Sequence, residues 1–114
     1  MLQNLNKMIQ KIKTELISSC INNDPESFLP FLMSGEVETE APNKEDFYQF
    51  FKGMLNHAHE SSEGQLTLKI EQPTLDTDKE VLNYNFYDNT HKYPLLSIVV
   101  KENNNLISLD VMPF

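Results

Sequence analysis

The sequence predicts an α+β domain in which three helices come first and an antiparallel sheet follows. In the first half of the chain, apolar residues recur every three or four positions, which is the period of an amphipathic helix. After Gly64 the pattern changes to short runs that alternate apolar and polar residues, which is the period of a half-buried strand. The chain has 114 residues, of which 39% are hydrophobic, so we expect one globular domain over residues 1–114.

The first two predicted helices are separated by a break at Asn22-Asn23-Asp24-Pro25. A stripe at helical spacing predicts the first helix over residues 2–21, and it is made of Leu5, Ile9, Ile12, Leu16 and Cys20. Asp24 is a suitable cap for the second helix, and Pro25 suits its first position because no N–H is needed there. Pro30 would remove a hydrogen bond deep inside a helix, so the second helix is expected to be short, over residues 26–33.

A short strand and a third helix follow. Residues 35–40 are expected to form the strand, with Val37 directed inward and Glu38 outward. Asn43 is the expected cap of a helix that runs to Ala58. Its predicted apolar stripe consists of Phe47, Phe50, Phe51, Met54, Leu55 and Ala58. Gly53 lies inside this helix and weakens it by about 1 kcal/mol relative to alanine, which close packing against a neighbour could explain.

Four alternating runs predict the strands of the sheet. The residues expected to face the helices are Leu66, Leu68 and Ile70 in the first run, Leu82, Tyr84 and Phe86 in the second, Leu96, Ile98 and Val100 in the third, and Ile107, Leu109 and Val111 in the last. The connections 73–79, 88–92 and 103–105 are rich in turn-forming residues. These connections are short, so neighbouring runs are expected to pair antiparallel in a meander.

This order of elements resembles the nuclear transport factor 2-like superfamily, which includes ketosteroid isomerase, scytalone dehydratase and polyketide-cyclase-like proteins. The features that carry the resemblance are the break at residues 22–26, the helix at 43–58 and the closing strand at 106–111. The resemblance implies that the sheet curves around the helices into an α-α-β-α-β-β-β-β cone, whose mouth holds an apolar ligand and whose opposite face pairs in a dimer. A cystatin-like fold is the alternative, but it leaves the second and third helices without a role.

Two sets of candidate site residues follow from this assignment of faces. The pocket for a small hydrophobic ligand is predicted to be lined by Phe28, Phe51, Leu68, Tyr84, Phe86, Ile98 and Leu109. Tyr84 is the one polar group expected there, although it could equally be a core aromatic residue. The homodimer is predicted to form through the outer face of the sheet, by way of Val81, Tyr87, Leu95, Val99, Leu106 and Met112.

The sequence favours a non-catalytic domain. General acid–base chemistry needs a titratable group beside the substrate, and the predicted pocket offers only Tyr84. The isomerases of the resembled family use a tyrosine of the first helix with two acidic residues, and the first helix here contains no tyrosine. An isomerase, dehydratase or cyclase remains an alternative, which requires Glu38, His57 or Asp110 to meet in one cavity.

No metal site or cofactor is expected. His57 and His59 would point about 200° apart on a helix, which is unsuited to joint ligation. Cys20 is the single cysteine, so no internal disulfide can form, and we expect it to pack as a small hydrophobic residue.

The net charge of the chain limits the classes of partner that we expect it to bind. The net charge is −8, and the segment 24–46 holds seven acidic residues against Lys44 alone. Such a field disfavours binding of nucleic acid. No apolar stretch approaches the roughly 18 residues that span a membrane, and a cytoplasmic location is expected. An alternative function is therefore an acidic protein that binds a basic partner, as bacterial immunity proteins bind nuclease toxins.

Overall fold

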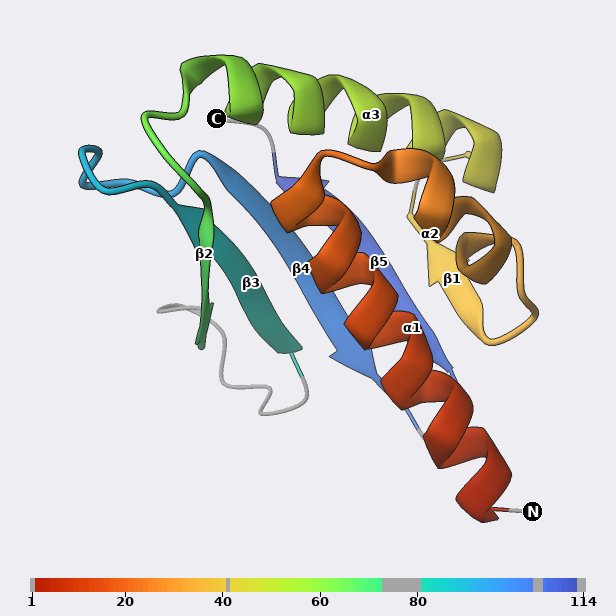
Figure 1. Ribbon diagram of the computed structural model, residues 1–114. Coiled ribbons are helices and arrows are strands. Elements are labelled where there is room, and N and C mark those ends of the chain that lie inside the picture. The colour runs from red at the N-terminus through yellow and green to blue at the C-terminus, as the bar shows by residue number, and fades with distance from the viewer. Residues whose placement is uncertain (1, 41, 73–80, 104–105, 113–114) are drawn as a thin grey trace.

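A computed structural model describes residues 2–40, 42–72, 81–103 and 106–112, with the side chains of residues 2–6 and 112 left out. Within these ranges the predicted fold class is confirmed, because three helices pack on one five-stranded sheet (Figure 1). The helices are α1 (Leu2–Asn22), α2 (Pro25–Leu32) and α3 (Lys44–Ser61). The strands are β1 (Val37–Thr39), β2 (Thr67–Glu71), β3 (Val81–Tyr87), β4 (Leu96–Glu102) and β5 (Ile107–Met112).

The sheet is mixed, whereas the sequence predicted an antiparallel one. Its strand order is β1-β5-β4-β3-β2, and β2 to β5 form the predicted antiparallel meander. β1 lies beside β5 and runs parallel to it, with Val37 opposite Ile107 and Thr39 opposite Leu109. A parallel pair needs a long connection, and here that connection includes α3 and three strands. The result is that the acidic segment around β1 lies next to the last strand.

Local signals placed the starts of α2 and α3 within one residue, whereas α3 ends at Ser61, three residues beyond the predicted end at Ala58. The Asp24 side chain accepts a hydrogen bond from the Ser27 backbone N–H, and α2 begins at Pro25. The Asn43 side chain accepts one from the Asp46 backbone N–H at 2.8 Å, and α3 begins at the next residue. The predicted connection 73–79 and most of the loop 103–105 lie outside the described residues.

The core forms where α2 and α3 meet the helix-facing side of the sheet. The rings of Phe28 and Phe51 lie 5.7 Å apart between centroids, and those of Phe47 and Phe51 lie 6.0 Å apart. Two residues predicted to face the core are instead exposed, Phe50 by 65% and Ile70 by 50%. Phe50 lies on the flank of α3, about 100° from Phe51, and Ile70 belongs to β2, an edge strand with one described neighbour.

Strand alternation places side chains largely as predicted. Leu96, Ile98, Val100, Ile107 and Leu109 are buried against the helices. The differences are Asn85 and Ser97, which are also buried although they lie on the other face. The sheet therefore carries a buried polar pair on the side that the described helices leave uncovered.

Replacement of Gly53 by alanine should stabilise the protein. A Cβ built on Gly53 meets no atom within 4 Å, so the suggestion that close packing requires this glycine is wrong. We expect Gly53→Ala to raise the free energy of unfolding by about 1 kcal/mol, measured by urea denaturation. Gly64→Ala is the contrasting control, because Gly64 has φ +106° and alanine is strained there. A destabilised Gly53→Ala protein would contradict the open position of this residue.

Candidate interaction site on the sheet

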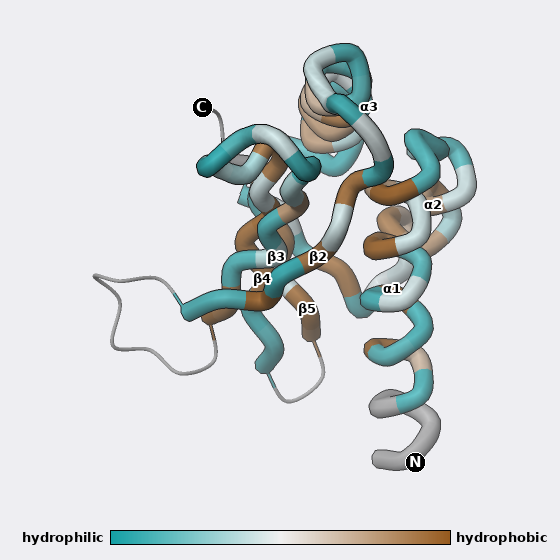
Figure 2. Tube along the Cα trace, turned by 60° about the vertical axis from the view of Figure 1, so that its left-hand side comes forward, coloured by the Kyte–Doolittle hydropathy of each residue, from teal (hydrophilic) through white to brown (hydrophobic). Residues whose placement is uncertain are grey.

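One face of the sheet is free of described helices. Figure 2 shows α1 and α2 on one side of the strands and α3 across their end. We call the opposite side the open sheet face. Its outward residues on the described strands are Glu38, Thr67, Lys69, Glu71, Val81, Asn83, Asn85, Tyr87, Ser97, Val99, Lys101, Ser108 and Asp110.

A hollow of about 490 Å³ lies on this face where β1, β5, β4 and β3 run side by side. We call it the acidic hollow. It is lined by Glu38, Thr39, Glu40, Val81, Val99, Lys101, Asn103, Ser108, Leu109 and Asp110. Strand register explains how it forms, because Glu38 lies opposite Ser108, and Val99 lies opposite Asp110. Residues of the acidic segment around β1 and of the C-terminal strand thus share one concave surface.

The charges of the hollow are unbalanced. Among the described residues, Glu38, Glu40 and Asp110 contribute three carboxylates to the hollow, and Lys101 contributes its one cation. Within the described part of the chain, none of these three carboxylates makes a hydrogen bond or an ion pair. Lys101 does have an interaction of its own. Carboxylates held near one another repel, and a cation placed between them relieves that repulsion. The hollow is thus suited to a positively charged group.

The hollow contains two of the three residues named for the catalytic alternative. Glu38 and Asp110 do meet there, but His57 is exposed on α3 and does not line it. The two carboxylates lie on the side of the sheet opposite the predicted ligand pocket, in a hollow that opens to solvent. Acid–base catalysis relies on groups enclosed with the substrate. The arrangement favours binding over catalysis.

The predicted ligand-pocket residues form part of the hydrophobic core. Phe28, Phe51, Phe86 and Ile98 have no exposed surface, while Leu109 is 1% and Tyr84 4% exposed, and Leu68 is half-buried. Burial raises the pKa of the Tyr84 hydroxyl, with a smaller contribution from the charge of Glu102. Of the seven residues, Leu109 alone lines the acidic hollow. Their role in binding an apolar ligand stays a prediction.

Of the predicted dimer-face residues, Val81, Tyr87 and Val99 lie on the open sheet face, whereas Leu95 precedes β4 and packs against the core. Nothing shows that these residues pair with a second copy. Val81, Tyr87, Leu95, Val99 and Leu106 are all half-buried in the single chain. The side chain of Met112 lies outside the described part. Val81 and Val99 form an apolar section of the acidic hollow. The homodimer stays a prediction.

A hydrogen-bond network occupies the other half of the open sheet face. The Ser97 hydroxyl donates to Asn85 Oδ1, and Asn85 Nδ2 donates to Glu71 Oε1 at 3.0 Å. The Tyr87 hydroxyl donates to the same Glu71 oxygen at 2.6 Å, and Lys69 Nζ lies 5.1 Å from the Tyr87 ring centroid. The bond from Tyr87, with that from Asn85, lowers the pKa of Glu71. These polar groups satisfy one another, whereas the three carboxylates of the hollow have no such partner among the described residues.

This network was not predicted from the sequence. Asn85 and Ser97 sit at outward positions and looked like solvated residues. The signal that could have found them is their place in the predicted sheet, since antiparallel pairing of the second and third runs sets Asn85 opposite Ser97. The buried polar pair fixes the register of β3 against β4, because a shift by one residue would leave both groups without partners.

A second hollow, of about 370 Å³, lies between the α1–α2 turn and α3. It is lined by Asn23, Pro25, Gln49, Lys52, Gly53 and Asn56. Its described side chains are mostly exposed amides, with Lys52 as the one charged residue among them. It offers neither an apolar floor nor a concentration of charge, so it is a weaker candidate than the acidic hollow.

The remaining sequence candidates do not come together. Among the described residues, no three His, Cys, Asp or Glu side chains are placed to hold a metal ion. His59 Nε2 lies 2.7 Å from the Cys20 carbonyl oxygen and links α3 to α1, whereas His57 points to solvent. Cys20 is fully buried, and burial raises the pKa of its thiol. No described helix is long and apolar enough to cross a membrane.

Comparison with known proteins identifies no relative. No family model, curated protein or solved structure matches the chain. The resemblance to the nuclear transport factor 2-like superfamily therefore stays a prediction.

Proposed function

We propose that this chain is a non-catalytic interaction domain that binds a basic segment of a partner protein in the acidic hollow. The observation that carries the proposal is the meeting of Glu38, Glu40 and Asp110 beside the apolar side chains of Val81 and Val99. Apolar surface can hold the hydrocarbon stem of a lysine or arginine while the carboxylates bind its charged end. The volume of the hollow lies within the range of about 300–1,000 Å³ that is usual for ligand sites.

A basic partner suits the open sheet face better than a second copy of the chain does. A twofold homodimer through this face would bring two acidic hollows toward each other. Like charges that face each other across an interface oppose association, whereas opposite charges accelerate it. The net charge of −8 adds a long-range attraction for basic proteins. The domain that presents this face is proposed to have a nuclear transport factor 2-like architecture.

Binding of a basic peptide should depend on the hollow and not only on net charge. The probe is a capped peptide of three arginines separated by glycines, titrated calorimetrically at low ionic strength. The test variant is Glu38→Gln/Glu40→Gln/Asp110→Asn. The matched control, Glu26→Gln/Glu60→Gln/Glu63→Gln, removes the same charge from exposed positions outside the hollow. We expect the test variant to bind about tenfold more weakly than the control, and added salt to reduce this difference.

Equal affinities of the two triple variants would show that net charge alone attracts the peptide, and would contradict the site. Absence of binding to the wild-type protein would contradict the function itself. A wild-type protein that sediments as a dimer, with the dimer lost in the test variant, would instead assign the open sheet face to self-association.

A further inference from the structure

One edge of the sheet is an exposed strand. β2 lies at the end of the strand order, and β3 is its one neighbour among the described strands (Figure 1). Its five residues include no proline, and its register with β3 runs without a bulge from Thr67 to Glu71. Ile70 keeps 50% of its surface exposed, although it points to the helix side of the sheet. The outer backbone groups of such a strand can pair with a further strand.

The charges of β2 are complementary to themselves. Lys69 and Glu71 are two residues apart, so both point to the open sheet face, and Ile70 lies between them on the other face. If two β2 strands pair antiparallel about a twofold axis beside Ile70, Lys69 of each copy lies opposite Glu71 of the other. The two Ile70 side chains then meet. An axis beside Lys69 or Glu71 would instead set like charges directly opposite each other, which is unfavourable.

Neither charged side chain has an ion-pair partner in its own chain, within the residues that the structure describes. The Tyr87 hydroxyl and Asn85 Nδ2 both donate to Oε1 of Glu71, and no described group donates to its second oxygen. Lys69 Nζ lies over the Tyr87 ring. These contacts hold both side chains on the open sheet face, where a second copy can supply the opposite charge.

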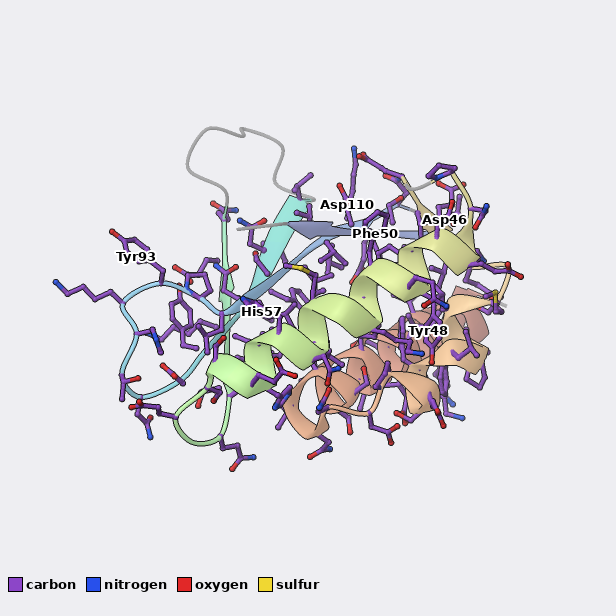
Figure 3. All side chains as sticks on the ribbon, turned by 90° about the horizontal axis from the view of Figure 1, so that it is seen from above. Asp46, Tyr48, Phe50, His57, Tyr93 and Asp110 are labelled. Atoms are coloured by element: carbon purple, nitrogen blue, oxygen red, sulfur yellow. The ribbon has the colours of Figure 1, made fainter. Side chains whose placement is uncertain are left out.

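We propose that two copies of this chain associate through β2, in an antiparallel register centred on Ile70, and so join their sheets edge to edge. The twofold axis of such a pair is perpendicular to the sheet, so both open sheet faces lie on the same side of the dimer. No residue of β2 lines the acidic hollow. Asp110 of the hollow lies on β5, which β4 and β3 separate from β2 (Figure 3). The dimer thus goes beyond the function proposed above and leaves the hollows free.

Two charge reversals test this register. Lys69→Glu and Glu71→Lys each set like charges opposite each other in a dimer of one variant, whereas an equimolar mixture restores both opposite-charge pairs. We expect sedimentation equilibrium between about 10 μM and 1 mM to show a monomer–dimer equilibrium of the wild-type protein. Each variant alone should dissociate with a constant about tenfold higher, and the mixture should associate as the wild-type protein does. The matched controls are Lys52→Glu and Glu60→Lys, at exposed positions of α3, which should leave the dimer unchanged.

Cross-linking provides a measurement that does not alter the charges. In the proposed register the Cβ atoms of the two Ile70 residues lie about 5 Å apart, so a short bismaleimide should join two copies of Ile70→Cys. Thr67→Cys is the control on the same strand, because its counterpart would lie about 20 Å away and should not be joined. Cys20 is fully buried and does not compete in the folded protein.

A wild-type protein that stays monomeric up to about 1 mM would overturn the proposed dimer. A dimer that both charge reversals leave intact, or that is lost in the Glu38/Glu40/Asp110 variant, would place the contact elsewhere and overturn the role of β2. Folded variants whose mixture does not associate, or equal cross-linking of Ile70→Cys and Thr67→Cys, would overturn the register. Circular dichroism verifies the fold of each variant. Because peptide binding to the hollow is measured separately, either proposal can fail while the other stands.

Discussion

Phe51→Ala is expected to lower the free energy of unfolding by about 3–5 kcal/mol. Phe51 has no exposed surface, and its ring contacts Phe28 of α2 and Phe47 of its own helix. Its removal loses the hydrophobic transfer energy of the ring and leaves a cavity where two helices meet. Urea denaturation of the purified variant, compared with the wild-type protein, measures the effect.

Phe50→Ala provides a control within the same helix. It removes the same side chain one residue earlier, where it is mostly exposed, so its effect on stability should stay within about 0.5 kcal/mol. Similar losses of stability in the two variants would contradict the orientation of α3 in which Phe51 is buried and Phe50 is exposed. A cost below about 1 kcal/mol for Phe51→Ala would show that its ring borders empty space, which would favour the predicted apolar ligand pocket.

Loss of the Asp88 carboxylate should also destabilise the protein strongly at neutral pH. Its side chain is fully buried and accepts hydrogen bonds from the backbone N–H groups of Glu63, Thr90 and His91, at 2.9, 3.0 and 2.8 Å. His91 Nδ1 lies 2.8 Å from its second oxygen. Through these hydrogen bonds, the carboxylate links the connection after α3 to the loop that joins β3 and β4. Asp88→Ala leaves these backbone donors without their acceptor.

The contribution of the Asp88 carboxylate to the free energy of unfolding should disappear at acid pH. The backbone hydrogen bond from Glu63 is the largest cause that holds the pKa of this carboxyl well below its usual value, and the bonds from His91 and Thr90 add to it. A carboxyl whose pKa is depressed in the folded state stabilises that state above its unfolded pKa, near 3.9. As the pH falls below about 4, the unfolded chain binds a proton that the folded chain does not, and the stabilisation is lost.

Urea denaturation of the wild-type protein and of Asp88→Ala at pH 7, 5, 4 and 3 measures this dependence. The difference between their midpoints should be large and constant at pH 7 and 5, and should narrow from pH 4 to pH 3. Glu63→Ala is a suitable control, because Asp88 is bound by the Glu63 backbone N–H and not by its side chain. A difference that stays constant down to pH 3 would contradict the role assigned to the ionised carboxylate.

Features encoded within a few residues were predictable from the sequence. The caps Asp24 and Asn43 and the alternation of the four C-terminal runs gave the element types, their order and the fold class. Each depends on neighbours close along the chain, so the local pattern is sufficient. The exposure of Phe50 was not predictable in the same way, because five other apolar residues of α3 make a stripe wide enough to include it.

The candidate site required contacts that are distant along the chain. The alternation of side chains along the strands correctly predicted that Glu38 and Asp110 point away from the helices. Their meeting, however, depends on the parallel pairing of β1 with β5, whose partners Glu38 and Ser108 are 70 residues apart. No residue pattern near β1 specifies that neighbour, and tertiary packing decides it. The sequence therefore contained every residue of the acidic hollow without indicating that they would share one surface.

Chemical-shift mapping tests the interaction surface most directly. Isotope-labelled protein would be titrated with the triple-arginine peptide, and the backbone amide signals assigned and followed. The largest changes are expected for Glu38–Glu40, Val99 and Ser108–Asp110, with little change at Asn23, Lys52 and Asn56 of the second hollow. Changes centred on the second hollow, or spread evenly over all acidic residues, would contradict the assignment of the open sheet face as the binding surface.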